Sequence, residues 1–173
     1  IGGFIIPGPD SKRVIVRGIG PSLGNFGVPD VLADPTLELF AGDGTLIATN
    51  DNWKSDQQVE IEGTGLQPTN DLEAAIVTTL PAEGAAYTAI LSGKNGATGV
   101  GLIEAYDLDG AANSKLANIS TRGFVDTGDN AMIGGFILGG GTAEVIVRAI
   151  GPSLTAFGVA GALQDPRLDL YDS

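Results

Sequence analysis

Short runs of apolar and β-branched residues, separated by glycine, proline and polar turns, dominate the pattern of this chain. Such runs at this spacing are typical of half-buried strands in antiparallel sandwiches and barrels. We therefore expect about ten short strands, no long helix and no alternation of strands with helices. The predicted strands cover residues 1–6, 13–19, 36–40, 45–49, 72–80, 86–91, 98–106, 116–125, 131–138, 144–150 and 167–171. The predicted fold class is all-β, an antiparallel β-sandwich or jelly roll.

Glycine-containing turns punctuate these strands. The sequence Ala41-Gly-Asp-Gly44 is a strong hairpin signal, and Asn95-Gly96 favours a type I′ turn. Residues 22–32 are expected to be irregular, with at most a helical turn. Residues 50–70 are polar, with Trp53 as their large anchor, and the start of the 72–80 segment also allows a helix.

The opening of the chain recurs near its end. Residues 1–5 return as 133–137, and residues 14–23 return as 145–154 with one change. The offset is 132 at first (133 − 1) and 131 afterwards (145 − 14), so a loop has lost one residue. The repeat unit is therefore about 131 residues long, an ordinary domain size.

The repeat predicts a β-sandwich unit over residues 1–132 and a partial second copy over 133–173, whose strands complete the same, the next or a neighbouring unit. A segment of about 40 residues rarely folds without disulfides, metal or a partner. The second copy would pack in a string of domains, or complete the sheet of another molecule in an open-ended filament. Alternatively, the two copies form halves of one closed barrel, but the 116–125 strand has no early counterpart. The chain begins at Ile1 rather than Met, as expected for a processed or excised piece.

Charge and composition exclude several functions. The net charge is −12, with 21 acidic and 9 basic residues, which would repel nucleic acid. The chain has no Cys and no His, which removes disulfides, thiolate chemistry and the commonest general base. Ser22 and Ser153 lack the Gly-x-Ser-x-Gly elbow, so we expect no enzyme. No run approaches the roughly 20 apolar residues of a membrane span.

Part of the chain follows a known domain pattern of strand, hairpin, strand ending in Asn-Asp, further strand, and a Tyr-containing strand. The matching parts are residues 37–52, 72–80 and 85–91, with Pro81-Ala-Glu-Gly84 and Tyr87. They resemble the bacterial pre-peptidase C-terminal domain over residues 36–106. The resemblance implies a secreted β-sandwich, often calcium-binding, appended to a larger extracellular protein. The Val-Arg-x-Ile-Gly-Pro-Ser-Leu and Ser-Thr-Arg-Gly-Phe signatures are similar to repeats near the ends of large secreted bacterial proteins. We therefore expect an extracellular or cell-surface location.

One loop region concentrates oxygen ligands. The candidate metal ligands are Asp43, Asn50, Asp51, Asn52 and Asp56. Calcium takes six to eight oxygens, many from short acidic side chains and loop carbonyls, although EF-hand spacing is absent. The alternative is that these residues only form turns. Residues 126–130 are a second, weaker candidate for a calcium site and are better explained as a turn.

An arginine recurs within the repeated strand. Alternation places Arg17 on one face with Ile15 and Ile19, so it should be partly buried and paired. The candidate partners are Asp34 or Glu38 for Arg17, and Asp165 or Asp169 for Arg148. The alternative is a binding site for an anion or a carboxylate ligand.

Aromatic residues make up only 6% of the chain, which favours core packing over a flat sugar-binding face for Trp53, Tyr87 and Tyr106.

The sequence as a whole predicts a structural domain of an extracellular tandem-repeat or filament-forming protein whose partner is itself. The alternative is a calcium-dependent module that binds carbohydrate or a surface and is appended to a secreted enzyme. Glycans would then be the partners.

Overall fold

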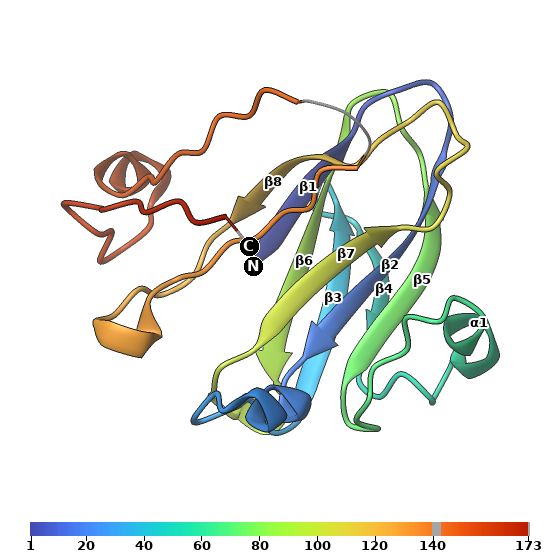
Figure 1. Ribbon diagram of the computed structural model, residues 1–173, viewed down its shortest axis with the longest axis horizontal. Coiled ribbons are helices and arrows are strands. Elements are labelled where there is room, and N and C mark those ends of the chain that lie inside the picture. The colour runs from blue at the N-terminus through green and yellow to red at the C-terminus, as the bar shows by residue number, and fades with distance from the viewer. Residues whose placement is uncertain (140–142, 173) are drawn as a thin grey trace. The chain divides into compact units, whose positions relative to one another are not determined.

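The computed structural model describes residues 1–139 and 143–172 and divides into two compact units, Ile1–Arg122 and Gly123–Ser173. All eight strands of the described chain lie in the first unit (Figure 1). They are β1 (Gly2–Ile6), β2 (Lys12–Ile19), β3 (Pro35–Ala41), β4 (Leu46–Asn50), β5 (Ala74–Leu80), β6 (Ala85–Gly93), β7 (Leu102–Asp107) and β8 (Ala117–Thr121). The short helices of this unit are α1 (Gln58–Glu62) and the 3-10 turns η1 (Pro21–Phe26) and η2 (Lys94–Gly96). The second unit contains the 3-10 turns η3 (Gly128–Asn130) and η4 (Pro152–Phe157).

The strands of the first unit form two antiparallel sheets. The five-stranded sheet has the order β4-β3-β6-β1-β8, and the three-stranded sheet has the order β5-β2-β7. The first and last strands of the unit pair with each other, with Gly3 opposite Ser120. The all-β fold class is confirmed. Within residues 1–122 the first strand, β1, lies beside the last strand, β8, in the larger sheet.

The core lies between the two sheets because alternate residues of each strand point inward. Val14 and Val16 enter this core, whereas Ile15 faces the other side of the three-stranded sheet, against Trp53 and Ile61. The buried residues of the core between the sheets are Phe4, Ile6, Val14, Val16, Leu37, Leu39, Ala74, Ile76, Leu80, Ala82, Tyr87 and Ala89. Each large apolar side chain buried there contributes about 1.5–3 kcal/mol.

The Asn95-Gly96 turn has the backbone expected of it. The φ angle is 55° at Asn95 and 77° at Gly96, and a type I′ turn requires positive values at both positions. The strands on either side of it nevertheless belong to different sheets, β6 to the larger and β7 to the smaller. The turn chemistry therefore fixes the local reversal but not the pairing.

The strands predicted at 131–138, 144–150 and 167–171 are wrong for the described parts of these segments, since no strand occurs in residues 123–139 or 143–172. A strand needs a neighbour for its backbone hydrogen bonds. In the first unit β1 pairs with β6 and β8, and β2 pairs with β5 and β7. The second copy repeats only the sequence from β1 to β3, so it does not contain those neighbours.

Within the described residues, no helix has the length and apolar character needed to cross a bilayer.

Candidate functional site in the second copy

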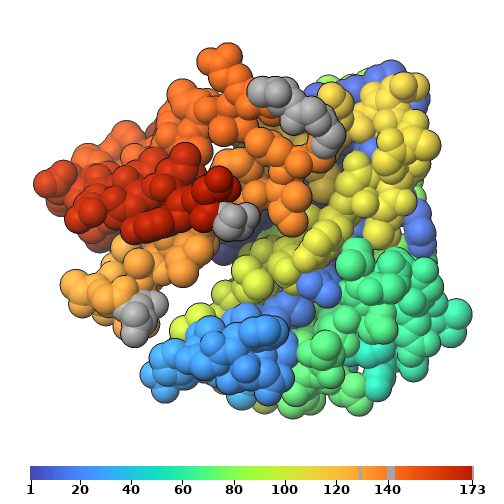
Figure 2. Space-filling model, in the orientation of Figure 1, coloured from blue at the N-terminus to red at the C-terminus, as the bar shows by residue number. Residues whose placement is uncertain are grey.

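The same apolar positions are buried in the first copy and exposed in the second. The pairs are Phe4 and Phe136, Ile6 and Leu138, Val14 and Val145, Ile15 and Ile146, Val16 and Val147, Ile19 and Ile150, Leu37 and Leu168, and Leu39 and Leu170. The first members are at most 7% exposed, and the second members are at least 38% exposed. The second copy is drawn in orange to red in Figure 2. Monomeric proteins rarely expose apolar side chains on this scale, and such exposure is typical of surfaces that contact a protein, a membrane or a ligand.

The neighbours of β2 explain its burial. Ile15 lies opposite Val77 of β5 on one side and opposite Tyr106 of β7 on the other. Ile146 has the same sequence neighbours but no strand beside it in the described residues, and it is 85% exposed. The difference between the copies is therefore a difference of pairing rather than of sequence.

The loop that follows each copy of this strand keeps its shape. Gly20, before η1, has φ −144° and ψ −80°, and Gly151, before η4, has φ −131° and ψ −79°. Gly27 and Gly158, which end these turns, have φ angles of 80° and 77°, a region that favours glycine. This part of the repeat folds locally, without the sheets.

In the first unit this loop receives a buried carboxylate. The backbone N–H groups of Gly20 and Ser22 donate to Oε1 of Glu73 at 3.1 and 2.9 Å, and the Ser22 hydroxyl donates to the same atom at 2.5 Å. Glu73 is completely buried. Ser153, the counterpart of Ser22, is exposed, and no carboxylate is bound to it in the described residues. Glu73 was not recognised from sequence because it lies in a segment that also resembles a helix start.

Arg17 is paired, but not with the residues expected. Its Nε donates to Oε2 of Glu104 at 3.0 Å, its Nη2 also pairs with that oxygen, and its Nη1 donates to the Leu66 carbonyl at 2.8 Å. The guanidinium carbon lies 5.1 Å from the centre of the Tyr106 ring. The prediction of Asp34 or Glu38 is wrong because β7, rather than β3, runs beside β2 and places Glu104 opposite Arg17.

The second arginine has neither of its expected partners. Arg148 is exposed and makes no ion pair within the described chain, whereas Asp169 pairs with Arg167 at 3.0 Å. The Glu104 carboxylate that serves Arg17 has no counterpart in the second copy, because the repeat does not reach β7.

Four of the five candidate calcium ligands lie within residues 50–56, from the last residue of β4 into the loop after it. Asn50 is buried, and its Nδ2 lies 3.2 Å from the Asn52 carbonyl and 3.4 Å from Oδ2 of Asp56. Its Oδ1 accepts a hydrogen bond from the Ala75 N–H at 3.0 Å, which ties the loop to β5. Asp51 lies between Asn50 and Asn52 in this loop.

The fifth candidate, Asp43, lies at the other end of the β3–β4 hairpin. Asn50 is opposite Leu37, so the turn that carries Asp43 is about 15 Å away along the strand. Oδ1 of Asp43 accepts a hydrogen bond from the Thr45 N–H at 2.9 Å, which lowers the pKa of Asp43. Asp43 therefore makes a turn and is separated from the other candidates.

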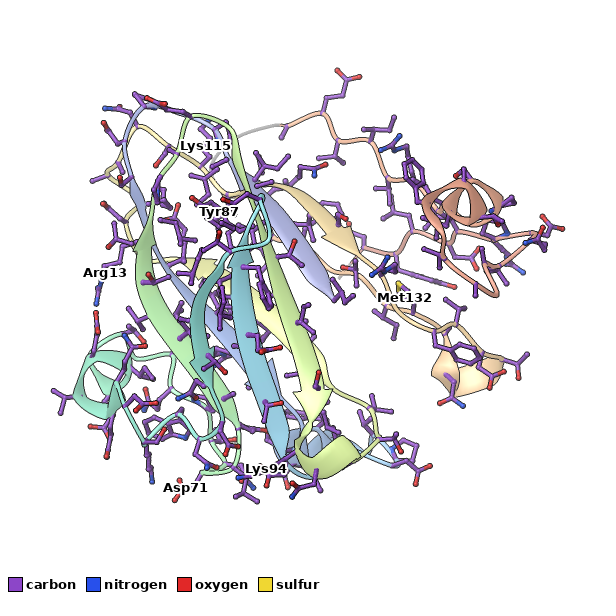
Figure 3. The ribbon with its side chains drawn as sticks, turned by 180° about the vertical axis from the view of Figure 1, so that it is seen from behind. Arg13, Asp71, Tyr87, Lys94, Lys115 and Met132 are labelled. Carbon is purple, nitrogen blue, oxygen red and sulfur yellow. The ribbon has the colours of Figure 1, made fainter. Side chains whose placement is uncertain are left out.

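The side chain of Lys94 pairs with a carboxylate of the loop that contains the candidate calcium ligands Asn50 to Asp56. Lys94, labelled at one end of the sandwich in Figure 3, donates from Nζ to Oδ2 of Asp51 at 2.5 Å and lies 3.8 Å from Oδ2 of Asp34. The hydrogen bond to Asp51 is the main cause of the raised pKa of Lys94. The Oδ1 atoms of Asp34, Asp51 and Asn52 are buried without a hydrogen-bond partner. Within the described residues, no group of three or more His, Cys, Asp or Glu side chains is arranged to hold a metal.

The aromatic residues pack inside the first unit. Tyr87 lies in the core between the sheets (Figure 3), and its hydroxyl donates to the Pro81 carbonyl at 2.7 Å. Burial raises the pKa of Tyr87. Trp53 belongs to the separate cluster behind the three-stranded sheet. Both residues are 4% exposed, which supports the core interpretation over a flat sugar-binding face.

These features define an all-β unit followed by a partial copy of its own opening strands. In comparisons with known proteins, the chain matches no family model, no curated protein and no solved structure.

Proposed function

We propose that this chain is a structural building block of an extracellular tandem-repeat or filament-forming protein. Copies would assemble head-to-tail by sharing or donating β-strands. The contrast between Ile15, which is 0% exposed, and Ile146, which is 85% exposed, carries the proposal. Each such side chain gains about 1.5–3 kcal/mol when it is buried, so pairing of the second copy with strands that lack an opening segment of their own is favourable.

Strand addition also suits the backbone of the second copy. Among the described residues, the backbone of residues 133–138 and 145–150 forms no hydrogen bond, and an added strand satisfies such N–H and C=O groups along its whole length. A contact of this kind joins one end of a unit to the other end of the next. It is heterologous and does not close, so it generates a string or a fibre.

The extracellular setting of the proposal rests on the resemblance to secreted bacterial domains. A net charge of −12 fits a soluble surface that repels nucleic acid and accepts cations. We assign no catalytic role to this chain.

Negative-stain electron microscopy of the natively produced material, with mass analysis of the same sample, tests the proposal. Filaments built from chains near 17.5 kDa would indicate strand exchange between molecules. Filaments or strings built from one longer chain would indicate tandem repeats. Discrete monomers of the 17.5 kDa chain would contradict the assembly proposal.

A calcium-dependent module that binds carbohydrate or a surface is the second candidate. The buried, unpartnered Oδ1 atoms of Asp34, Asp51 and Asn52 favour it, because calcium binds oxygens of this kind. In this structure the ammonium group of Lys94 neutralises the Asp51 carboxylate of this loop. We therefore expect Lys94→Ala to bind calcium more tightly than the parent chain in isothermal titration after chelation. Adding Asp51→Asn should abolish the gain, and equal heats for all three proteins would reject the site.

A further inference from the structure

The first unit shows how the repeated strand is received. β2 lies between β5 and β7, with Val14 opposite Thr78 on one side and Asp107 on the other. Residues 145–150 have the β2 sequence over the same six positions, with Ala149 as the one change from Gly18. Identical side chains on the same alternating pattern fit the same pair of neighbours in the same register.

We propose that residues 145–150 are received between the β5 and β7 strands of a second copy of this unit, with Arg148 paired to that copy's equivalent of Glu104. The inference rests on the proposed function and adds the partner strands, the register and the charge pair.

The charged group supports this register. Arg17 is held by Glu104 and the Leu66 carbonyl, with 16% of its side chain exposed. Arg148 repeats Arg17 but is exposed and makes no ion pair among the described residues. A strand shifted by one residue would turn Arg148 to the opposite face, where Val14 and Val16 of the first unit enter the apolar core.

The loop after the strand points to the same partner. In the first unit, Gly20 and Ser22 bind Glu73, the residue directly before β5. Gly151 and Ser153 hold the equivalent loop in the same backbone shape. Docking of residues 145–150 beside a second β5 would bring its equivalent of Glu73 to this loop.

The single substitution within residues 145–150 is compatible with docking. The first two positions of β2, Lys12 and Arg13, are Ala143 and Glu144 in the second copy and lie before this segment. A Cβ atom at Gly18 would lie 2.5 Å from Cδ1 of Leu91, the far end of a flexible side chain. The equivalent leucine of a second copy therefore needs only to rotate to admit Ala149.

The number of strands buried and exposed on docking shows whether the partner unit can keep its own β1 and β2. In an intact unit, β1 and β2 already fill the places beside β6, β5 and β7. Exchange with an intact unit would expose one opening segment for each segment it buried, with no net gain. The partner must therefore be a copy of the strands from β4 to β8 that lacks its own opening segment.

The test extends the chain with a second copy of residues 43–122 joined after Ser173, which holds the position equivalent to Gly42. Hydrogen exchange of residues 145–150 is compared between the original and the extended chain. We expect exchange to slow by about 100-fold or more only in the extended chain. Arg148→Glu in the extended chain should remove most of this protection, and Glu104→Arg in the appended copy should restore it. Arg167→Glu, at an exposed position, is the matched control.

The outcomes separate this inference from the broader function. Protection that Arg148→Glu leaves unchanged would overturn the register and the charge pair while leaving a tandem structural role. Protection of residues 145–150 in polymers of the original chain would overturn the need for an open partner while supporting assembly. No protection in either chain would overturn the inference, and the electron microscopy then decides the broader function separately.

Discussion

Ser22 and Glu73 meet in the interior of the first unit, where the Ser22 hydroxyl donates to Oε1 of Glu73 at 2.5 Å. The N–H groups of Ser22 and Gly20 donate to the same oxygen, and the Asn70 N–H donates to Oε2 at 3.3 Å. One carboxylate thus fixes the loop after β2 to the start of β5.

Removal of this carboxylate should destabilise the unit. We expect Glu73→Ala to lower the free energy of unfolding by about 2–5 kcal/mol, because several buried donors lose their acceptor. Urea unfolding followed by circular dichroism measures the change. Glu62→Ala, on the exposed side of α1, is the control and should stay within about 0.5 kcal/mol of the parent chain. Equal stability of the two variants would show that Glu73 does not anchor the loop.

The two copies of one isoleucine offer a matched pair of substitutions. Ile15→Ala should cost the first unit about 2–5 kcal/mol, since Ile15 is fully buried. Ile146→Ala should change the unfolding of the same unit by less than about 0.5 kcal/mol, since Ile146 is exposed. Denaturant unfolding of both variants checks this, and a large loss from Ile146→Ala would mean that the second copy already packs on strands.

The pair of Arg17 and Glu104 predicts a non-additive effect. Arg17→Met alone should cost about 1–3 kcal/mol, because the partly buried Glu104 loses its cation. The double variant Arg17→Met with Glu104→Leu should cost less than the sum of the two single variants. A double-mutant cycle by urea unfolding measures the coupling. Unchanged stability of Arg17→Met would contradict a structural role for the pair.

Three raised pKa values predict weaker folding at alkaline pH. Hydrogen bonding to Asp51 raises the pKa of Lys94, and burial is the main cause of the raised pKa of Tyr87 and of Tyr106. A raised pKa means that the folded state holds the proton more tightly than the unfolded state does. The stabilisation is complete below the unfolded pKa values of about 10 and is lost as pH rises through the folded ones.

We therefore expect the urea midpoint to fall between about pH 10 and 12. The combined variant Lys94→Met and Tyr87→Phe should show a shallower decline over the same range. A midpoint that does not change with pH in the parent chain, or an equal decline in both proteins, would count against these groups as the cause.

Much of the first unit follows from its sequence. Alternation around Val14 and Val16 predicted β2, and Ala41-Gly-Asp-Gly44 predicted the β3–β4 hairpin. The α1 helix was not predicted, because its five residues are too few to show a clear period. Of the candidate site, the loop from Asn50 to Asp56 comes together, while the involvement of Lys94 was missed. Lys94 reaches this loop only because β6 pairs with β3.

The sequence by itself determines the local shape of the repeat. The loops at η1 and η4 have the same capping glycines and nearly the same dihedral angles, although only the first lies in a complete sandwich. Bonds within a few residues and the conformational freedom of glycine are enough to set such a turn.

Only the tertiary structure decides which copy becomes sheet. The Val-Ile-Val-Arg sequence forms a buried strand at residues 14–17 and an exposed segment at 145–148 that pairs with no strand of the described chain. Strand hydrogen bonds and apolar burial come from neighbours that are distant in sequence, and the same is true of the pairing of Arg17 with Glu104. A β-strand sequence therefore states what a segment can become, and the available partners decide whether it does.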